Sequence, residues 1–175
     1  MAVTVDSRLL APARVTRAQA ERFLVPKPNG EYTDADVRHI LEQYFTVAPS
    51  VGLDPLLAVA QMELETANLS SDWAARPRRN PAGIGVTGQP GAGISFPSWV
   101  LSVRAHLGRL LAYALPANGG TAAQKALIAE ALTWRPLPAS KRGSAPTVTG
   151  LARSWATDPA YAAKIVTIAN AMLKA

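Results

Sequence analysis

Two carboxylates, Glu63 and Glu65, stand inside an otherwise apolar segment, MELETANL at residues 62–69. A charged group in a hydrophobic helix is costly unless it is paired, neutralised or used in chemistry. Burial raises the pKa of a carboxyl group, which then keeps its proton at neutral pH and can donate it to a leaving group. General acid catalysis is therefore the chemistry that this segment offers. The structural alternative is that both acids lie on a solvated helix face.

The segment belongs to a helix that we expect to begin at Asp54 and Pro55. Asp is a favoured N-cap residue and Pro a favoured first helical residue. The helix, PLLAVAQMELETANL, is apolar over much of its circumference. We therefore expect it to be central and surrounded by other helices.

Capping signals and apolar stripes predict five further helices. They are a short helix from Thr16 to before Pro26, a helix from Thr33 to about Ala48, one from Ser98 to before Pro116, one from Thr121 to about Leu132, and a last one that begins at Asp158-Pro159 and runs to the C-terminus.

The remaining segments are rich in Gly, Pro and polar residues. Residues 76–96 are expected to form a small hairpin or an irregular loop, and residues 135–150 a long basic and polar loop. The predicted fold class is all-α with at most a minimal β-hairpin. We divide the chain into an N-terminal arm with a short helix (1–30) and a main domain (31–175). On the helix after Ser98, the pattern places Val100 on the buried face.

Composition excludes several classes of protein. The chain has 175 residues, 49% of them hydrophobic, which fits one globular domain. It has no cysteine, so disulfides and thiolate chemistry are excluded. No apolar run is long enough to span a membrane. The two histidines, His39 and His106, have no matching acidic cluster, so we expect no metal site, and buried core roles for both.

The chain is basic, with a net charge of +6 and a pI near 10.1. This charge favours an anionic partner such as nucleic acid, acidic lipid or an anionic cell wall. Because the basic residues are scattered and no helix-turn-helix pattern is present, we do not expect nucleic-acid binding.

Four segments occur in an order that resembles a known family: AVAQMELETANLSS, RRNPAGIGVTG, FPSWVLSVRAHLGRLLAYA and WATDPAYAAKIVTIANAM. They are similar to the bacterial cell-wall endo-β-N-acetylglucosaminidases of glycoside hydrolase family 73, a lysozyme-like group. The similarity covers roughly residues 33–175. It implies a lysozyme-like fold, hydrolysis of β-1,4 glycosidic bonds in peptidoglycan, and no cofactor.

The resemblance also assigns site residues. The family's catalytic Glu falls on Glu65, before Thr66, whereas Glu63 falls where the family tolerates an apolar residue. The substrate-binding positions implied by the matching motifs are Asn80, Gly83, Trp155 and Tyr161.

A second catalytic carboxylate is not evident. Glycosidases commonly use two acids, and the resembled family carries the second on a hairpin. The corresponding stretch here, VTGQPGAGIS, holds no acid, and Asp72 is the nearest candidate in sequence. The substrate's N-acetyl group acting as internal nucleophile, or a lytic transglycosylase-like route, would need Glu65 alone.

The resulting prediction is a peptidoglycan hydrolase with a single Glu as general acid. The alternative is a non-catalytic or weakly active carbohydrate-binding domain of the same fold. We expect a monomer whose partner is peptidoglycan or a related N-acetylglucosamine polymer, located outside the cell or on the wall. The first residues, MAVTVDSRLL, do not resemble a signal peptide.

Overall fold

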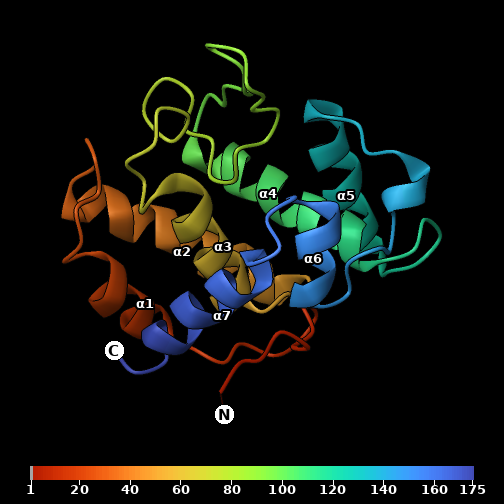
Figure 1. Cartoon of the computed structure of the whole chain (residues 1–175), viewed down its shortest axis with the longest axis horizontal. Coiled ribbons are helices and arrows are strands. Elements are labelled where there is room, and N and C mark those ends of the chain that lie inside the picture. Colours follow the sequence, from red (N-terminus) through yellow and green to blue (C-terminus); the bar gives the residue numbers. More distant parts are fainter. Residues whose placement is uncertain (1) are drawn as a thin grey trace.

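The computed structural model describes residues 2–175, and this part of the chain is helical without a β-sheet (Figure 1). It contains seven α-helices and one short 3-10 helix. Their bounds are α1 Arg17–Leu24, α2 Asp34–Ser50, α3 Pro55–Thr66, α4 Trp99–Ala114, α5 Ala122–Trp134, the 3-10 helix Ala139–Lys141, α6 Val148–Ser154 and α7 Tyr161–Met172. The predicted all-α fold is confirmed.

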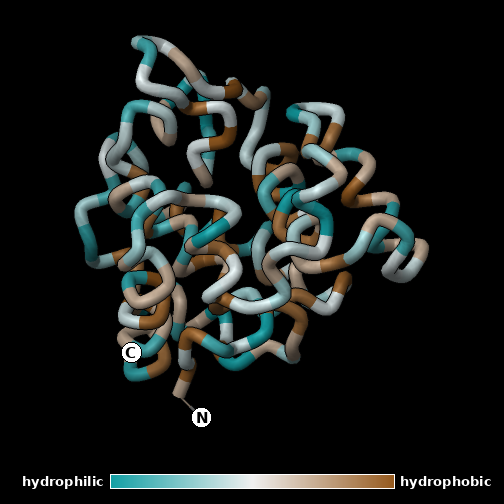
Figure 2. The backbone as a smooth tube through the Cα atoms, turned by 45° about the vertical axis from the view of Figure 1, so that its right-hand side comes forward, coloured by the Kyte–Doolittle hydropathy of each residue, from teal (hydrophilic) through white to brown (hydrophobic). Residues whose placement is uncertain are grey.

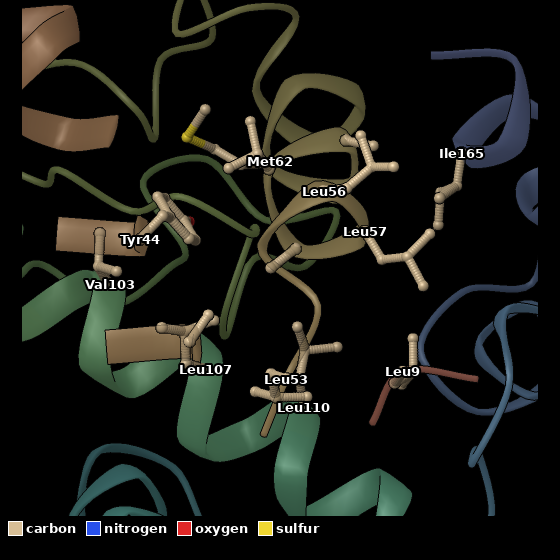
Figure 3. Packing of buried hydrophobic residues seen from close by; sticks show 14 of the residues in the cluster. Leu9, Tyr44, Leu53, Leu56, Leu57, Met62, Val103, Leu107, Leu110 and Ile165 are labelled. Carbon is tan, nitrogen blue, oxygen red and sulfur yellow. The ribbon is translucent and has the colours of Figure 1, made fainter. Parts of the chain in front are cut away.

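Helix α3 is the centre of the fold. Every residue from Pro55 to Met62 is buried, and the helix packs directly against α2 and α7. Leu56 and Leu57 of α3 belong to one continuous core with Tyr44 of α2, Leu107 and Leu110 of α4, and Ile165 of α7 (Figure 3). The surrounding helices are amphipathic, so hydrophobic residues recur at intervals along them (Figure 2). The apolar helix α3 is thus covered by α2 and α7, which pack directly on it.

The start of α3 is fixed by its predicted cap. The Asp54 carboxylate accepts a hydrogen bond from the backbone N–H of Leu56 at 3.0 Å. Its second oxygen pairs with the Arg14 guanidinium at 2.9 Å. Asp54 is buried, so this pair compensates a charge that would otherwise be costly. The predicted capping boxes at Thr16, Thr33 and Thr121 also form.

The N-terminal segment packs along the other elements. Leu9 is buried, and its backbone N–H bonds to the carbonyl of Pro146 while its carbonyl accepts from Asp54. Near the other end of the chain, the Asn170 side chain exchanges two hydrogen bonds with the backbone of Val3, each of 2.8 Å. These contacts bring both termini to the same side of the molecule (Figure 1).

The segment before α4 is an irregular loop. Residues 67–98 contain turns but no strand. One hydrogen bond of 2.9 Å, from Ile94 N–H to the Ile84 carbonyl, joins the two parts of the loop that contain these residues. Of the two expected alternatives, the irregular loop is therefore the one that forms.

Three details differ from the sequence-based expectation. The last helix begins at Tyr161 and not at Asp158, because the Asp158 side chain bonds to Ala160 N–H ahead of the helix. Residues Val148–Ser154 form α6, which overlaps the end of the expected 135–150 loop. Val100 is 41% exposed, whereas Val103, three residues later on the same face of α4, is fully buried.

Helices α4 and α5 cross closely at Gly108. A Cβ atom at this position would lie 2.3 Å from the Leu127 carbonyl oxygen and 2.6 Å from the Ala131 Cβ. We predict that Gly108→Ala destabilises the fold by about 1–3 kcal/mol through overpacking, although Ala is the better helix former by about 1 kcal/mol. Urea unfolding measures the difference.

The matched control is Gly88→Ala, because nothing lies within 4 Å of a Cβ built there. Its unfolding midpoint should not change. A Gly108→Ala variant as stable as the parent would contradict the close crossing.

Candidate active site

Glu65 lies in the last turn of α3, at the boundary between the core and the irregular loop. Its side chain is partly buried. The Trp73 indole N–H donates a hydrogen bond of 3.0 Å to the Glu65 backbone carbonyl, which holds the loop against the helix end. Glu65 is therefore fixed at a helix C-terminus, where backbone carbonyls disfavour a negative charge.

The chain turns sharply after Glu65. Ala67, Asn68 and Leu69 all have positive φ values of 47°, 55° and 65°. Such left-handed residues cost about 1–2 kcal/mol each when they are not Gly. The Thr66 hydroxyl stabilises the turn by donating to the Met62 carbonyl at 2.7 Å and accepting from Leu69 N–H at 2.8 Å. This strained turn ends α3 directly beside the catalytic candidate.

A chain of hydrogen bonds leads from Glu65 into the core. The Tyr161 hydroxyl donates to Glu65 Oε1 at 2.5 Å and accepts from Gln61 Nε2 at 2.8 Å. The Gln61 carbonyl oxygen contacts His106 Nε2 at 2.8 Å, and His106 Nδ1 contacts the Tyr44 hydroxyl at 2.7 Å. Four helices, α2, α3, α4 and α7, thus contribute to one polar network.

The network has a single consistent proton arrangement. Gln61 Oε1 can only accept, so His106 carries its proton on Nε2 and its Nδ1 accepts from Tyr44. Burial lowers the pKa of His106 to about 3, so the imidazole is neutral. Every hydrogen bond in the series from Tyr44 to Glu65 then has its donor on the Tyr44 side and its acceptor on the Glu65 side.

Two opposing effects set the pKa of Glu65. Burial raises the pKa and the hydrogen bond from Tyr161 lowers it, with a net upward shift. The residue therefore holds a proton at a higher pH than an exposed Glu does, as a general acid requires.

Glu63 has a different environment. It forms an ion pair with Lys27, which lies in the segment after α1. Its partner is thus a protein side chain, which supports a structural role for Glu63.

A cleft of about 290 Å³ lies next to Glu65. Gly83 lines it and also contacts the acid, since a Cβ at Gly83 would lie 3.3 Å from Glu65 Oε2. Glu65 itself is not one of the lining residues. The loop wall consists of Ala82, Gly83, Ile84 and Val86, and the helical wall of Arg109, Tyr113, Arg135, Ser154 and Trp155.

Gly83 and Trp155, both predicted as site residues, meet at this cleft. Gly83 has a φ of 61°, so a side chain there would be strained as well as close to the carboxylate. The Trp155 ring lies 5.7 Å from His106 and 5.4 Å from Tyr113 between ring centroids. Trp155 therefore connects the cleft to the hydrogen-bond network.

Asn80 has a structural role that replaces the predicted substrate contact. It is fully buried. Its amide nitrogen donates to the carbonyls of Ile84 at 2.8 Å and Ile94 at 3.1 Å, and its oxygen accepts from Ile84 N–H at 2.9 Å. Both amide functions hold the loop in shape, so no group of Asn80 remains for a ligand.

Tyr161 and Asp72 also differ from their predicted roles. Tyr161 was expected to bind substrate, but it is buried and binds Glu65, so it positions the acid. Asp72 is exposed on the loop. Within residues 2–175, no hydrogen bond or ion pair connects it to Glu65, and no Asp or Glu lines the cleft.

The roles of His106 and of the cleft arginines did not follow from the sequence. A buried, hydrogen-bonded His106 was expected, but not its connection to Glu65. The same expectation is wrong for His39, whose exposed ring lies 3.8 Å from Glu42. Arg109 and Arg135 lie 26 positions apart, and no spacing signal links them to each other or to Glu65.

Residues 2–175 show neither a metal site nor a membrane-spanning helix. No group of three or more His, Asp and Glu side chains is placed to hold a metal ion. None of the helices in that range has both the length and the hydrophobicity needed to cross a bilayer.

Comparison with known proteins identifies the family. The model of the Glucosaminidase family, described as mannosyl-glycoprotein endo-β-N-acetylglucosaminidase, matches residues 41–174. The chain belongs to this family, which is glycoside hydrolase family 73. It is a glycoside hydrolase with an all-α lysozyme-like fold, from a family of peptidoglycan hydrolases.

A protein of Borreliella burgdorferi, described as uncharacterized, is 29% identical over 147 residues, which cover 83% of this chain and 68% of that protein. No solved structure matches the chain.

The neutral His106 gives a testable pH dependence. In the unfolded chain a His has a pKa of about 6.5, whereas folded His106 has a pKa of about 3. Between these values only the unfolded state takes up the proton. The contribution of His106 to the free energy of unfolding should therefore fall as the pH drops from about 6.5 toward 3, by at most about 1.4 kcal/mol per pH unit.

Urea unfolding of the parent and of His106→Gln across this pH range isolates the effect, because all other titrating groups, including His39, are common to both. The stability difference between the two proteins should shrink as the pH falls. A difference that stays constant would contradict the neutral, buried state of His106.

Proposed function

We propose that this protein is an endo-β-N-acetylglucosaminidase that cleaves β-1,4 glycosidic bonds of peptidoglycan with Glu65 as its general acid. One observation carries the assignment. The Glu65 carboxyl group is partly buried, has a raised pKa, accepts a hydrogen bond from Tyr161, and lies against Gly83 at the edge of the cleft. Family membership supports the class of substrate.

In the proposed reaction, Glu65 donates its proton to the glycosidic oxygen as the bond from that oxygen to C1 breaks. The Tyr161 hydroxyl then stabilises the carboxylate that forms, because it already points at Oε1. Gly83 leaves the space beside Oε2 open for the approach of the leaving oxygen.

The group that stabilises C1 is proposed to come from the substrate. No acidic residue lines the cleft in residues 2–175, and Asp72 is exposed. The carbonyl oxygen of the substrate's own N-acetyl group can attack C1 and form a cyclic intermediate, as some glycosidases allow. Water then opens this ring and returns a proton to Glu65.

The proposed location is outside the cell or on the wall, where the substrate lies.

The first test replaces the acid. Glu65→Gln preserves the size of the side chain but cannot supply an acidic proton. Lysis of purified cell walls, followed by turbidity, should fall at least about 100-fold while the unfolding midpoint stays close to that of the parent.

Glu63→Gln is the matched control, since Glu63 is two residues away and paired with Lys27. It should retain lysis. Analysis of the released fragments identifies the reaction: reducing N-acetylglucosamine ends are expected, whereas anhydro ends would indicate transglycosylation. Absence of any lysis by the parent protein would favour a carbohydrate-binding domain.

The second test concerns the pH–rate profile. Removing the hydrogen bond from Tyr161 withdraws an interaction that favours the carboxylate, so the pKa of Glu65 should rise further. A general acid acts only while protonated, and the rate falls as the pH rises through its pKa. In Tyr161→Phe, the alkaline limb of the profile should therefore move to higher pH, and the maximal rate should fall as positioning is lost.

Tyr44→Phe serves as the control, because it removes a hydroxyl at the far end of the same network and leaves the Tyr161–Glu65 bond in place. Its alkaline limb should not move. A limb in Tyr161→Phe that stays put or moves to lower pH would exclude Glu65 as the titrating acid.

A further inference from the structure

Arg109 is a buried cation for which the protein supplies no anion. The residue lies on α4 and is 8% exposed. Its Nη1 atom donates to the backbone carbonyl of Arg135 at 2.9 Å. Across residues 2–175, no carboxylate lies within ion-pair distance of its guanidinium group. A buried charge without a counter-ion is costly, so its retention calls for a functional explanation.

The charge faces the cleft beside Glu65. Arg109 and Arg135 both line this cleft. The nearest acid along the chain, Glu130, is already engaged by Arg104 through contacts of 2.6–3.1 Å. The cleft therefore carries two positive charges that neither its walls nor this neighbouring acid neutralise.

Aromatic rings hold the Arg109 guanidinium group in place. It lies 5.7 Å from the Tyr113 ring and 6.0 Å from the Trp155 ring, between Cζ and ring centroid. A guanidinium group held in this way presents a planar set of N–H donors with little loss of conformational entropy. This geometry suits a carboxylate, which can accept two parallel hydrogen bonds.

We infer that Arg109 and Arg135 form an anion subsite that binds a carboxylate of the peptidoglycan strand during cleavage. This inference rests on the proposed function and specifies its substrate. Alternate sugars of peptidoglycan carry a lactyl ether whose carboxyl group is either free or extended by a peptide with carboxylates of its own. Chitin-type polymers share the glycosidic bond and the N-acetyl groups but are neutral. The subsite therefore selects the acidic wall polymer over neutral N-acetylglucosamine polymers.

Binding measurements on the full chain test the subsite apart from catalysis. The Glu65→Gln protein is titrated calorimetrically with three ligands: a neutral chitin oligosaccharide, glycan strands with free lactyl carboxylates, and strands that carry their peptides. Arg109→Gln and Arg135→Gln are introduced separately. Arg135 is exposed, so its replacement tests the subsite without disturbing the core.

Each substitution should weaken binding of the acidic strands by about tenfold or more, because a charge-assisted hydrogen bond is lost, and should change binding of the neutral oligosaccharide less than about twofold. Loss confined to the strands with free lactyl groups assigns the subsite to that carboxylate, and loss confined to the peptide-bearing strands assigns it to the peptide.

Arg142→Gln is the matched control. Like Arg109, Arg142 donates to a backbone carbonyl, that of Ala112 at 3.2 Å, but it does not line the cleft. It should leave all three affinities unchanged. Equal losses for neutral and acidic ligands, or no loss for either, would overturn the subsite while leaving the proposed function standing. If the Glu65→Gln protein binds none of the three ligands, both the anion subsite and the proposed function are overturned.

Discussion

The site depends on one hydrogen bond, from the Tyr161 hydroxyl to Glu65 Oε1 at 2.5 Å. A carboxyl group at the end of an apolar helix is tolerated only if its charge is compensated or its proton retained. Tyr161 provides the compensation, and burial favours the proton. Because Tyr161 belongs to α7 and Glu65 to α3, this bond also ties the last helix of the chain to the central one.

The rest of the network exists because that hydroxyl is itself buried. Tyr161, Gln61, His106 and Tyr44 are all enclosed in the core, where an unsatisfied polar atom costs about 1–3 kcal/mol. Each side chain in the network forms hydrogen bonds with its neighbours, so no polar atom of these four side chains is left without a partner. The result is a rigid polar line through a hydrophobic core, which holds the carboxyl group in one orientation and makes it suitable for proton donation.

The cleft is formed by an irregular loop on one side and by helix residues, including Arg109, on the other. Its loop wall is shaped by Asn80, whose amide satisfies backbone groups that no regular strand pairs. Its helical wall carries the Arg109 guanidinium group, which lacks a protein counter-ion within residues 2–175. The chain as a whole has a net charge of +6, and some of its basic residues are paired with acids, as Arg14 and Arg104 are. The Arg109 charge is buried, unlike that of an exposed Lys or Arg, and it lines a cleft that a ligand can enter.

The sequence determined the features that depend on local chemistry. The helix starts at Thr16, Thr33, Asp54, Ser98 and Thr121 follow from side chains that cap their own backbones, and the apolar character of α3 predicted its central position. Helix α6 was missed because it is one of the shortest, has no side-chain cap and contains Gly150. Tertiary structure decided what joins distant residues: the partner of Glu65 is 96 positions away, and the role of Asn80 was fixed only by the loop around it. Capping and periodicity act within a few residues, whereas a hydrogen bond between helices or an uncompensated charge at a cleft exists only once the chain has folded.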